Sequence, residues 1–143
     1  MSGLKKASNV LYIIGQSFTI LWIVTFIVFT VVSFIIAGPG YTDSIIEQLK
    51  EGKIHTSFVG TVEEQAAQIQ RMFIPFAIVL LVYTLITITK FVFTLLAKRS
   101  NVKIFYITSI VLSALEADVF LILASSFGLA ANKEVEEEIN VSL

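Results

Sequence analysis

Two apolar runs separated by a short cationic segment constrain this chain more than any other feature. The runs cover residues 72–97 and 104–131, and Lys98, Arg99 and Lys103 lie between them. Each run exceeds the roughly 20 residues that an α-helix needs to cross the hydrocarbon core of a bilayer. The pattern therefore predicts a transmembrane helical hairpin with its turn in the cytoplasm, because Lys and Arg mark the cytoplasmic ends of crossings.

A third apolar run covers residues 10–37 and follows Lys5 and Lys6. A signal peptide has an apolar stretch of only about 7 to 15 residues, so we expect an uncleaved helix here. Of the 143 residues, 56% are hydrophobic and only 15% are charged, which indicates an integral membrane protein of one domain. The sequence therefore predicts an all-α integral membrane protein with three transmembrane helices, over residues 10–37, 72–97 and 104–131.

The polar region between the first two runs, residues 41–71, is predicted to form a small extracellular helical cap. It contains two matches to the capping box, in which a hydroxyl residue and a Glu three positions later satisfy each other's backbone N–H groups. These matches are Ser44 with Glu47 and Thr61 with Glu64. We expect each to begin a helix, the second of which continues into the membrane.

The distribution of charge predicts the orientation of the chain. With three crossings, one side of the membrane holds five cations and no acid: Lys5, Lys6, Lys98, Arg99 and Lys103. Because Lys and Arg accumulate at cytoplasmic ends, we expect a multi-pass plasma-membrane protein with a cytoplasmic N-terminus. Three crossings then place the C-terminus and the acidic tail, residues 132–143, outside the cell.

Two acids in the last apolar run leave an alternative open. Glu116 and Asp118 lie near the middle of residues 104–131, where each charge costs about 2.5 to 3.5 kcal/mol on an insertion scale. The alternative is a turn at residues 116–118, which gives four crossings or a re-entrant hairpin. Each half would then be about 20 Å long, shorter than the roughly 30 Å core, and no Gly, Pro or Asn marks the turn. We therefore predict a single crossing.

Polar residues recur along the second run at helical spacing, at Tyr83, Thr87, Lys90 and Thr94. Since they share one helix face, that face should turn toward protein or water and not toward lipid. Lys90 and Glu116 lie at similar depths counted from the cationic turn, so an ion pair between them is our first hypothesis for a polar core. In a continuous helix Asp118 points to nearly the opposite side from Glu116, and only one of them can share that core.

Small residues form a stripe along the last run, at Ser109, Ser113, Ala117, Ala124, Gly128 and Ala131. Ala124 and Gly128 have the small-xxx-small spacing that lets helix backbones approach closely in a membrane. This stripe predicts close packing within the bundle or self-association between copies of the chain.

The residue types needed for common chemistry are missing or isolated. The chain has no cysteine, one histidine, His55, no glycine-rich phosphate loop and no Ser-His-Asp set. We therefore expect no enzymatic activity, no cofactor and no metal site. The cations lie next to the membrane, where they contact lipid headgroups, so we expect no nucleic-acid partner.

The order of parts in the second half of the chain resembles a known group of proteins. The parts are residues 61–64 leading into an apolar run, the cationic residues 98–103, and residues 124–133. Together they resemble the small multi-pass membrane proteins of unassigned function that are common in Gram-positive bacteria. That group is often drawn with four crossings, so the resemblance implies the turn at residues 116–118.

Two functions are compatible with the sequence. The first is a non-enzymatic binding partner or accessory subunit of a membrane complex, of the transporter, secretion or toxin-immunity type, with partner contacts at Glu47, Glu51, Glu63 and Glu64 of the cap. It fits a chain that is too small to enclose a transport route alone. The alternative is an oligomeric ion or proton pathway that uses Lys90 with Glu116 or Asp118.

Overall fold

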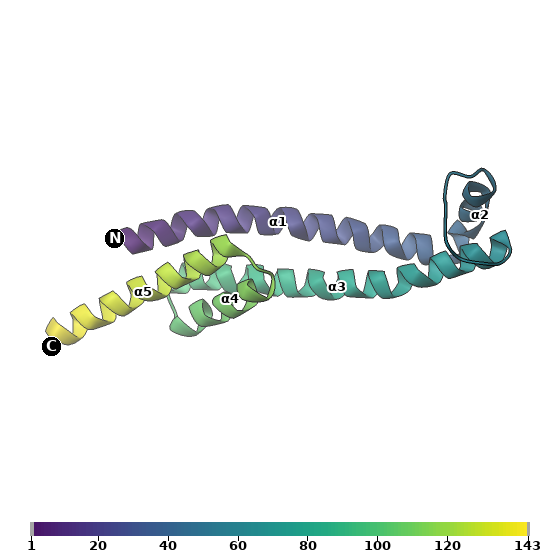
Figure 1. Ribbon diagram of the computed structural model, residues 1–143. Coiled ribbons are helices and arrows are strands. Elements are labelled where there is room, and N and C mark those ends of the chain that lie inside the picture. The colour runs from purple at the N-terminus through teal and green to yellow at the C-terminus, as the bar shows by residue number, and fades with distance from the viewer. Residues whose placement is uncertain (1, 143) are drawn as a thin grey trace. The chain divides into compact units, whose positions relative to one another are not determined.

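The computed structural model describes residues 2–142, and all its regular elements in that range are helices (Figure 1). The predicted all-α fold is thus confirmed. Among these residues, α1 and α3 are long and apolar enough to cross a membrane, judged by length and composition. The elements are α1 (Gly3–Ala37), the short 3-10 helix η1 (Pro39–Tyr41), α2 (Thr42–Lys50), α3 (Val62–Ser100), α4 (Lys103–Leu115) and α5 (Val119–Ser142).

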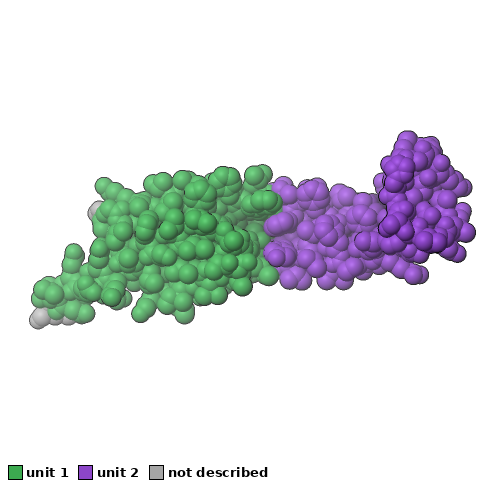
Figure 2. All heavy atoms as spheres, in the orientation of Figure 1, with its two compact units in different colours: residues 1–23, 85–143 green, residues 24–84 purple. Residues whose placement is uncertain are grey.

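The helices divide into two compact units (Figure 2). Unit 1 contains residues 1–23 and 85–143, and therefore the first part of α1, the last part of α3, and all of α4 and α5. Unit 2 contains residues 24–84, with the remaining parts of α1 and α3, η1 and α2.

In unit 2, the side chain of Gln70 in α3 forms hydrogen bonds with the end of α1 and the residue that follows it. Helix α1 ends two residues before Pro39, which has no backbone N–H to continue the helix. The side-chain amide of Gln70 donates to the carbonyl oxygens of Ile36 and Gly38, both at 2.9 Å, and its oxygen accepts from the Thr42 hydroxyl at 2.9 Å. The Ile36 carbonyl is one of the groups that a helix end leaves without intrahelical partners, and the Gly38 carbonyl also accepts from the Tyr41 N–H at 3.2 Å. One side chain thus joins α1, α2 and α3.

The start of α2 differs from the prediction, whereas the start of α3 agrees with it. Ser44 lies inside the first turn of α2 and accepts a hydrogen bond from Gln48 at 3.3 Å, so it is not a cap. Thr61 and Glu64 do form a capping box: each backbone N–H donates to the other's side chain at 3.2 Å. Helix α3 then runs on through Pro75 as one helix, as expected.

The end of α2 is a Schellman motif. Gly52 has a φ of +72°, and its N–H donates to the carbonyl of Leu49 at 3.2 Å. The next N–H, of Lys53, donates to the carbonyl of Gln48 at 3.0 Å. This pair of bonds is the usual way in which a glycine in the left-handed region ends a helix.

In unit 1, the last apolar run is not one helix. Helix α4 ends at Leu115 and α5 begins at Val119, and Ala117 between them has a φ of +53°. The single helix predicted over residues 104–131 is therefore wrong, and the break lies where the alternative placed a turn. Asp118 explains how the turn forms: its Oδ1 accepts from the N–H of Leu121 at 3.1 Å, which caps the start of α5.

Helix α5 packs against α4 and returns toward the start of α1 (Figure 1). The Ser8 hydroxyl donates to the carbonyl of Ala124 at 2.6 Å, and the hydroxyls of Tyr12 and Ser125 lie 2.9 Å apart. Within unit 1, the start of α1 and the end of α5 thus lie at the same end. This arrangement does not support a C-terminus on the opposite side of the membrane from the N-terminus.

Candidate functional site: a buried ion cluster at the hairpin tip

The turn between α4 and α5 carries two carboxylates that meet one buried lysine of α3. The Nζ of Lys90 lies 2.9 Å from Oε2 of Glu116 and 3.0 Å from Oδ2 of Asp118. The side chain of Lys90 is 2% exposed, against 11% for Glu116 and 15% for Asp118. The hypothesised Lys90–Glu116 pair is therefore present, and Asp118 joins it.

Each carboxylate oxygen of the cluster has its own hydrogen-bond partner. Lys90 donates to one oxygen of each carboxylate, the Thr87 hydroxyl lies 2.9 Å from Oε1 of Glu116, and the backbone N–H of Leu121 donates to Oδ1 of Asp118. Buried charges persist only when they are paired and hydrogen-bonded in this way. The cluster consequently fixes the turn between α4 and α5, the tip of the α4–α5 hairpin, to α3.

The turn explains why both acids reach the same lysine. On a continuous helix, residues two apart point about 200° apart, which was the reason to exclude one of them. Ala117 adopts the left-handed region and reverses the chain, so Glu116 directly follows α4 while Asp118 directly precedes α5. The expectation that only one acid shares the polar core is therefore wrong.

The formal charge of the cluster is −1, from one ammonium and two carboxylates. The other charged side chains of unit 1 lie among the first six residues, in residues 98–103, or beyond residue 132. Helix α4 separates the turn from residues 98–103 by on the order of 20 Å. No described side chain near the tip therefore balances the extra negative charge.

The polar face of α3 is only partly as expected. Thr87, Lys90 and Thr94 are buried, at 0%, 2% and 0% exposure. Tyr83 is 47% exposed and contacts the ring of Phe26, with centroids 6.3 Å apart. The buried polar residue one position on is Thr84, whose hydroxyl donates to its own helix at the carbonyl of Leu80.

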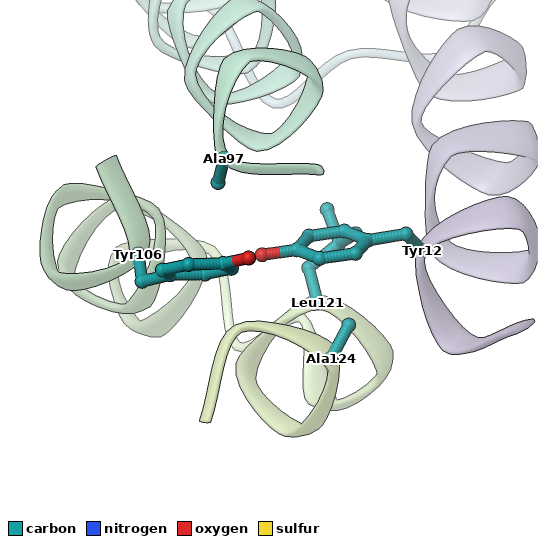
Figure 3. Packing of buried hydrophobic residues seen from close by; sticks show 5 residues of the cluster. All are labelled: Tyr12, Ala97, Tyr106, Leu121 and Ala124. Atoms are coloured by element: carbon teal, nitrogen blue, oxygen red, sulfur yellow. The ribbon is translucent and has the colours of Figure 1, made fainter. Parts of the chain in front are cut away.

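A second polar contact network lies nearer the ends of unit 1 and was not foreseen (Figure 3). Tyr12 of α1 and Tyr106 of α4 point their hydroxyls toward each other above Leu121 and Ala124 of α5. Tyr106 also accepts from Lys5 at 2.8 Å. Polar residues at spacings of four, four and three along α1 are the signal that would have found this face: Ser8, Tyr12, Gln16 and Thr19.

Residues of the small-residue stripe pack against other helices of the same chain. Ala124 and Gly128 are buried, and a Cβ added to Gly128 would overlap the ring of Tyr106 and approach the Ser8 hydroxyl to 3.0 Å. Packing within the bundle, one of the two expected uses of the stripe, is thus present. Self-association through Ala124 and Gly128 stays a prediction, and Ala117 of the stripe lies in the turn.

The four candidate glutamates of the cap are all exposed, but they differ in their contacts. Glu51 pairs with Lys53 at 2.6 Å, and Glu64 closes the capping box of α3. Within residues 2–142 no side-chain partner is present for Glu47 or Glu63. These two carboxylates are therefore the ones that folding leaves available.

No protein-family model, curated protein or solved structure matches this chain. The resemblance to small multi-pass proteins of Gram-positive bacteria accordingly stays a prediction. Among residues 2–142, no group of three or more His, Cys, Asp or Glu side chains is placed to hold a metal ion.

Proposed function

We propose that this chain is an integral membrane protein in which α1 and α3 cross the bilayer, and the α4–α5 hairpin enters from one side and returns to it. The observation that carries the proposal is the distribution of polarity. Among residues 2–142, the buried set has twelve polar or charged and nine hydrophobic residues, whereas 39 large hydrophobic residues are exposed. A water-soluble fold buries such apolar side chains, and a bilayer is the solvent that accepts them outside.

The lengths of the helices support the re-entrant hairpin. Helix α4 has 13 residues, which gives about 20 Å, so it is too short for a core of roughly 30 Å. The ion cluster at its tip therefore lies near mid-membrane. Cations next to the membrane ends orient unit 1 with its helix ends toward the cytoplasm: Lys5, Lys6, Lys98, Arg99 and Lys103.

Within this topology we propose that the protein is a non-enzymatic binding partner, acting as an accessory subunit of a membrane complex of the transporter, secretion or toxin-immunity type. The region 41–71 then lies outside the cell. Of the four candidate glutamates, Glu47 and Glu63 are exposed and have no side-chain partner within residues 2–142, so they are the proposed contacts for a basic surface on the partner. Glu51 and Glu64 have local roles and are secondary candidates.

The topology is testable with single cysteines, because the chain contains none. Ser57→Cys in the cap and Ser142→Cys at the end of α5 are each exposed positions. A membrane-impermeant maleimide should label Ser57→Cys in intact cells and Ser142→Cys only after permeabilisation. Labelling of Ser142→Cys in intact cells would show that α5 ends outside and that the re-entrant topology is wrong.

The binding role is tested by cross-linking and co-purification from native membranes. Glu47→Gln/Glu63→Gln should lose the co-purifying protein, while the matched control Glu134→Gln/Glu137→Gln, which removes two exposed acids from α5, should retain it. If the cap variant keeps the same partner in the same amount, the cap is not the contact surface.

The ion cluster favours a second candidate function, an oligomeric ion or proton pathway. Ionisable residues inside a membrane commonly mark such pathways, and Lys90, Glu116 and Asp118 meet there. Purified protein in liposomes distinguishes the two functions. Flux that disappears in Glu116→Gln or Asp118→Asn supports a pathway, and vesicles that stay electrically silent support the binding role.

A further inference from the structure

We infer that the ion cluster at the hairpin tip binds one proton, held on Oε1 of Glu116 and donated to the hydroxyl of Thr87. This inference rests on the proposed membrane placement. The binding role does not require a proton at this site, whereas a proton pathway would use Glu116 as its proton-carrying group.

The first step of the argument is charge balance. One ammonium faces two carboxylates, and the other groups that contact them, the Thr87 hydroxyl and the Leu121 N–H, are neutral. The parts of the helices of unit 1 outside its charged ends carry no further charged side chain: residues 7–23 of α1, 104–115 of α4 and 119–132 of α5. A net charge in a low-dielectric interior is strongly unfavourable. One added proton makes the cluster neutral.

The second step is to ask which oxygen can hold the proton. Three of the four carboxylate oxygens accept from groups that can only donate, namely the Lys90 ammonium and the Leu121 N–H. A proton on any of those would place two donors against each other. Only Oε1 of Glu116 faces a group that can also accept, the Thr87 hydroxyl at 2.9 Å.

The third step is whether Thr87 can accept that hydrogen bond. A threonine hydroxyl in a helix can donate to the carbonyl four residues earlier, which leaves its lone pairs available. Two other threonines of α3 do this: Thr84 donates to Leu80 and Thr89 to Leu85, both at 2.8 Å. Thr87 is 0% exposed, so no water competes for its lone pairs.

Another buried polar group lies beside the turn. Ser113 is fully buried, and its hydroxyl has no hydrogen-bond partner among residues 2–142. It lies one turn before Glu116 on α4, and its carbonyl accepts from the Asp118 N–H at 2.9 Å.

The two acids are consequently unequal, and amide substitutions separate them. Glu116→Gln copies the protonated state, because the new NH₂ donates to Thr87 while the remaining oxygen accepts from Lys90. We expect its unfolding equilibrium constant in micelles to stay within about twofold of the parent chain. Asp118→Asn places an NH₂ against Lys90 or the Leu121 N–H, so we expect about a tenfold or greater loss.

Infrared spectroscopy of the full chain in liposomes tests the proton directly. The unsubstituted protein should show, at neutral pH, a protonated-carboxyl C=O band that shifts in D₂O. The band should vanish in Glu116→Gln and remain in the matched control Glu63→Gln. No such band in the unsubstituted protein overturns the inference, even if both amide variants fail to fold.

Other outcomes have equally definite meanings. A band that persists in Glu116→Gln, or a stability loss as large for Glu116→Gln as for Asp118→Asn, overturns the assignment to Glu116. A band that disappears on adding Na⁺ at constant pH shows a metal-cation site instead and also overturns it. Cysteine labelling tests membrane placement separately, so membrane-inserted protein without the band refutes only this inference.

Discussion

Gly128 of α5 lies directly against the ring of Tyr106 of α4, with no space for a side chain between them. Gly128→Ala should therefore force the helices apart and lower the free energy of unfolding by about 1 to 3 kcal/mol, the usual cost of overpacking. Reversible SDS unfolding in micelles, followed by circular dichroism, measures this. Gly3→Ala is the matched control, because nothing lies within 4 Å of the position. Equal stabilities would mean that α4 and α5 do not pack as described.

Lys90 is the only cation that contacts Glu116 and Asp118 among the described residues. Lys90→Met keeps the length of the side chain but removes the ammonium that both Glu116 and Asp118 contact. We expect a loss of about 3 to 5 kcal/mol, as for other buried ion pairs from which one partner is removed. Lys103→Met, at an exposed position, should change stability by less than about 1 kcal/mol. Similar losses for both lysines would contradict the buried cluster.

Ala117 and Ala114 should respond in opposite directions to glycine. Ala117 has a φ of +53°, where glycine avoids a penalty of about 1 to 2 kcal/mol, so Ala117→Gly should be neutral or stabilising. Ala114 is exposed within α4, and Ala114→Gly should cost about 0.5 to 1 kcal/mol. The same unfolding assay compares them. A destabilising effect of both would indicate one continuous helix through residues 114–117.

Gln70→Ala should destabilise unit 2 more than Gln68→Ala. Gln70→Ala removes the side-chain donor to the carbonyls of Ile36 and Gly38 in unit 2, and the Gly38 carbonyl keeps only its bond from the Tyr41 N–H, so the loss should be about 1 to 3 kcal/mol. Gln68→Ala removes a side chain with no hydrogen bond within residues 2–142. Protease sensitivity of the region 41–71 in liposomes provides the measurement. If the two variants are cleaved at the same rate, Gln70 does not hold the end of α1.

The sequence predicted those contacts that depend on regular helix geometry. The pairing of Lys90 with Glu116 followed from counting residues on both sides of the cationic turn, because helices have a fixed rise per residue. The capping box of Thr61 and Glu64 is a local interaction, so a stretch of four residues was enough to predict it.

The contacts that the sequence did not predict depend on the backbone conformation of Ala117. Ala117 has no turn signature, and its left-handed backbone is stabilised by what the turn brings together, namely two acids and one lysine distant in sequence. The direction of α5 follows from that choice. Its contacts with Ser8 and Tyr12 were therefore beyond a pattern-based prediction.

Unit 1 joins segments that a ribosome makes at very different times. Ser8 and Ala124 are 116 positions apart, and synthesis at about 5 to 20 residues per second separates them by several seconds or more. Until α5 is made, the Ser8 hydroxyl and the Tyr12 hydroxyl lack the partners that they contact in the folded chain. Unit 1 can therefore form its full set of contacts only after residue 125 has been synthesised.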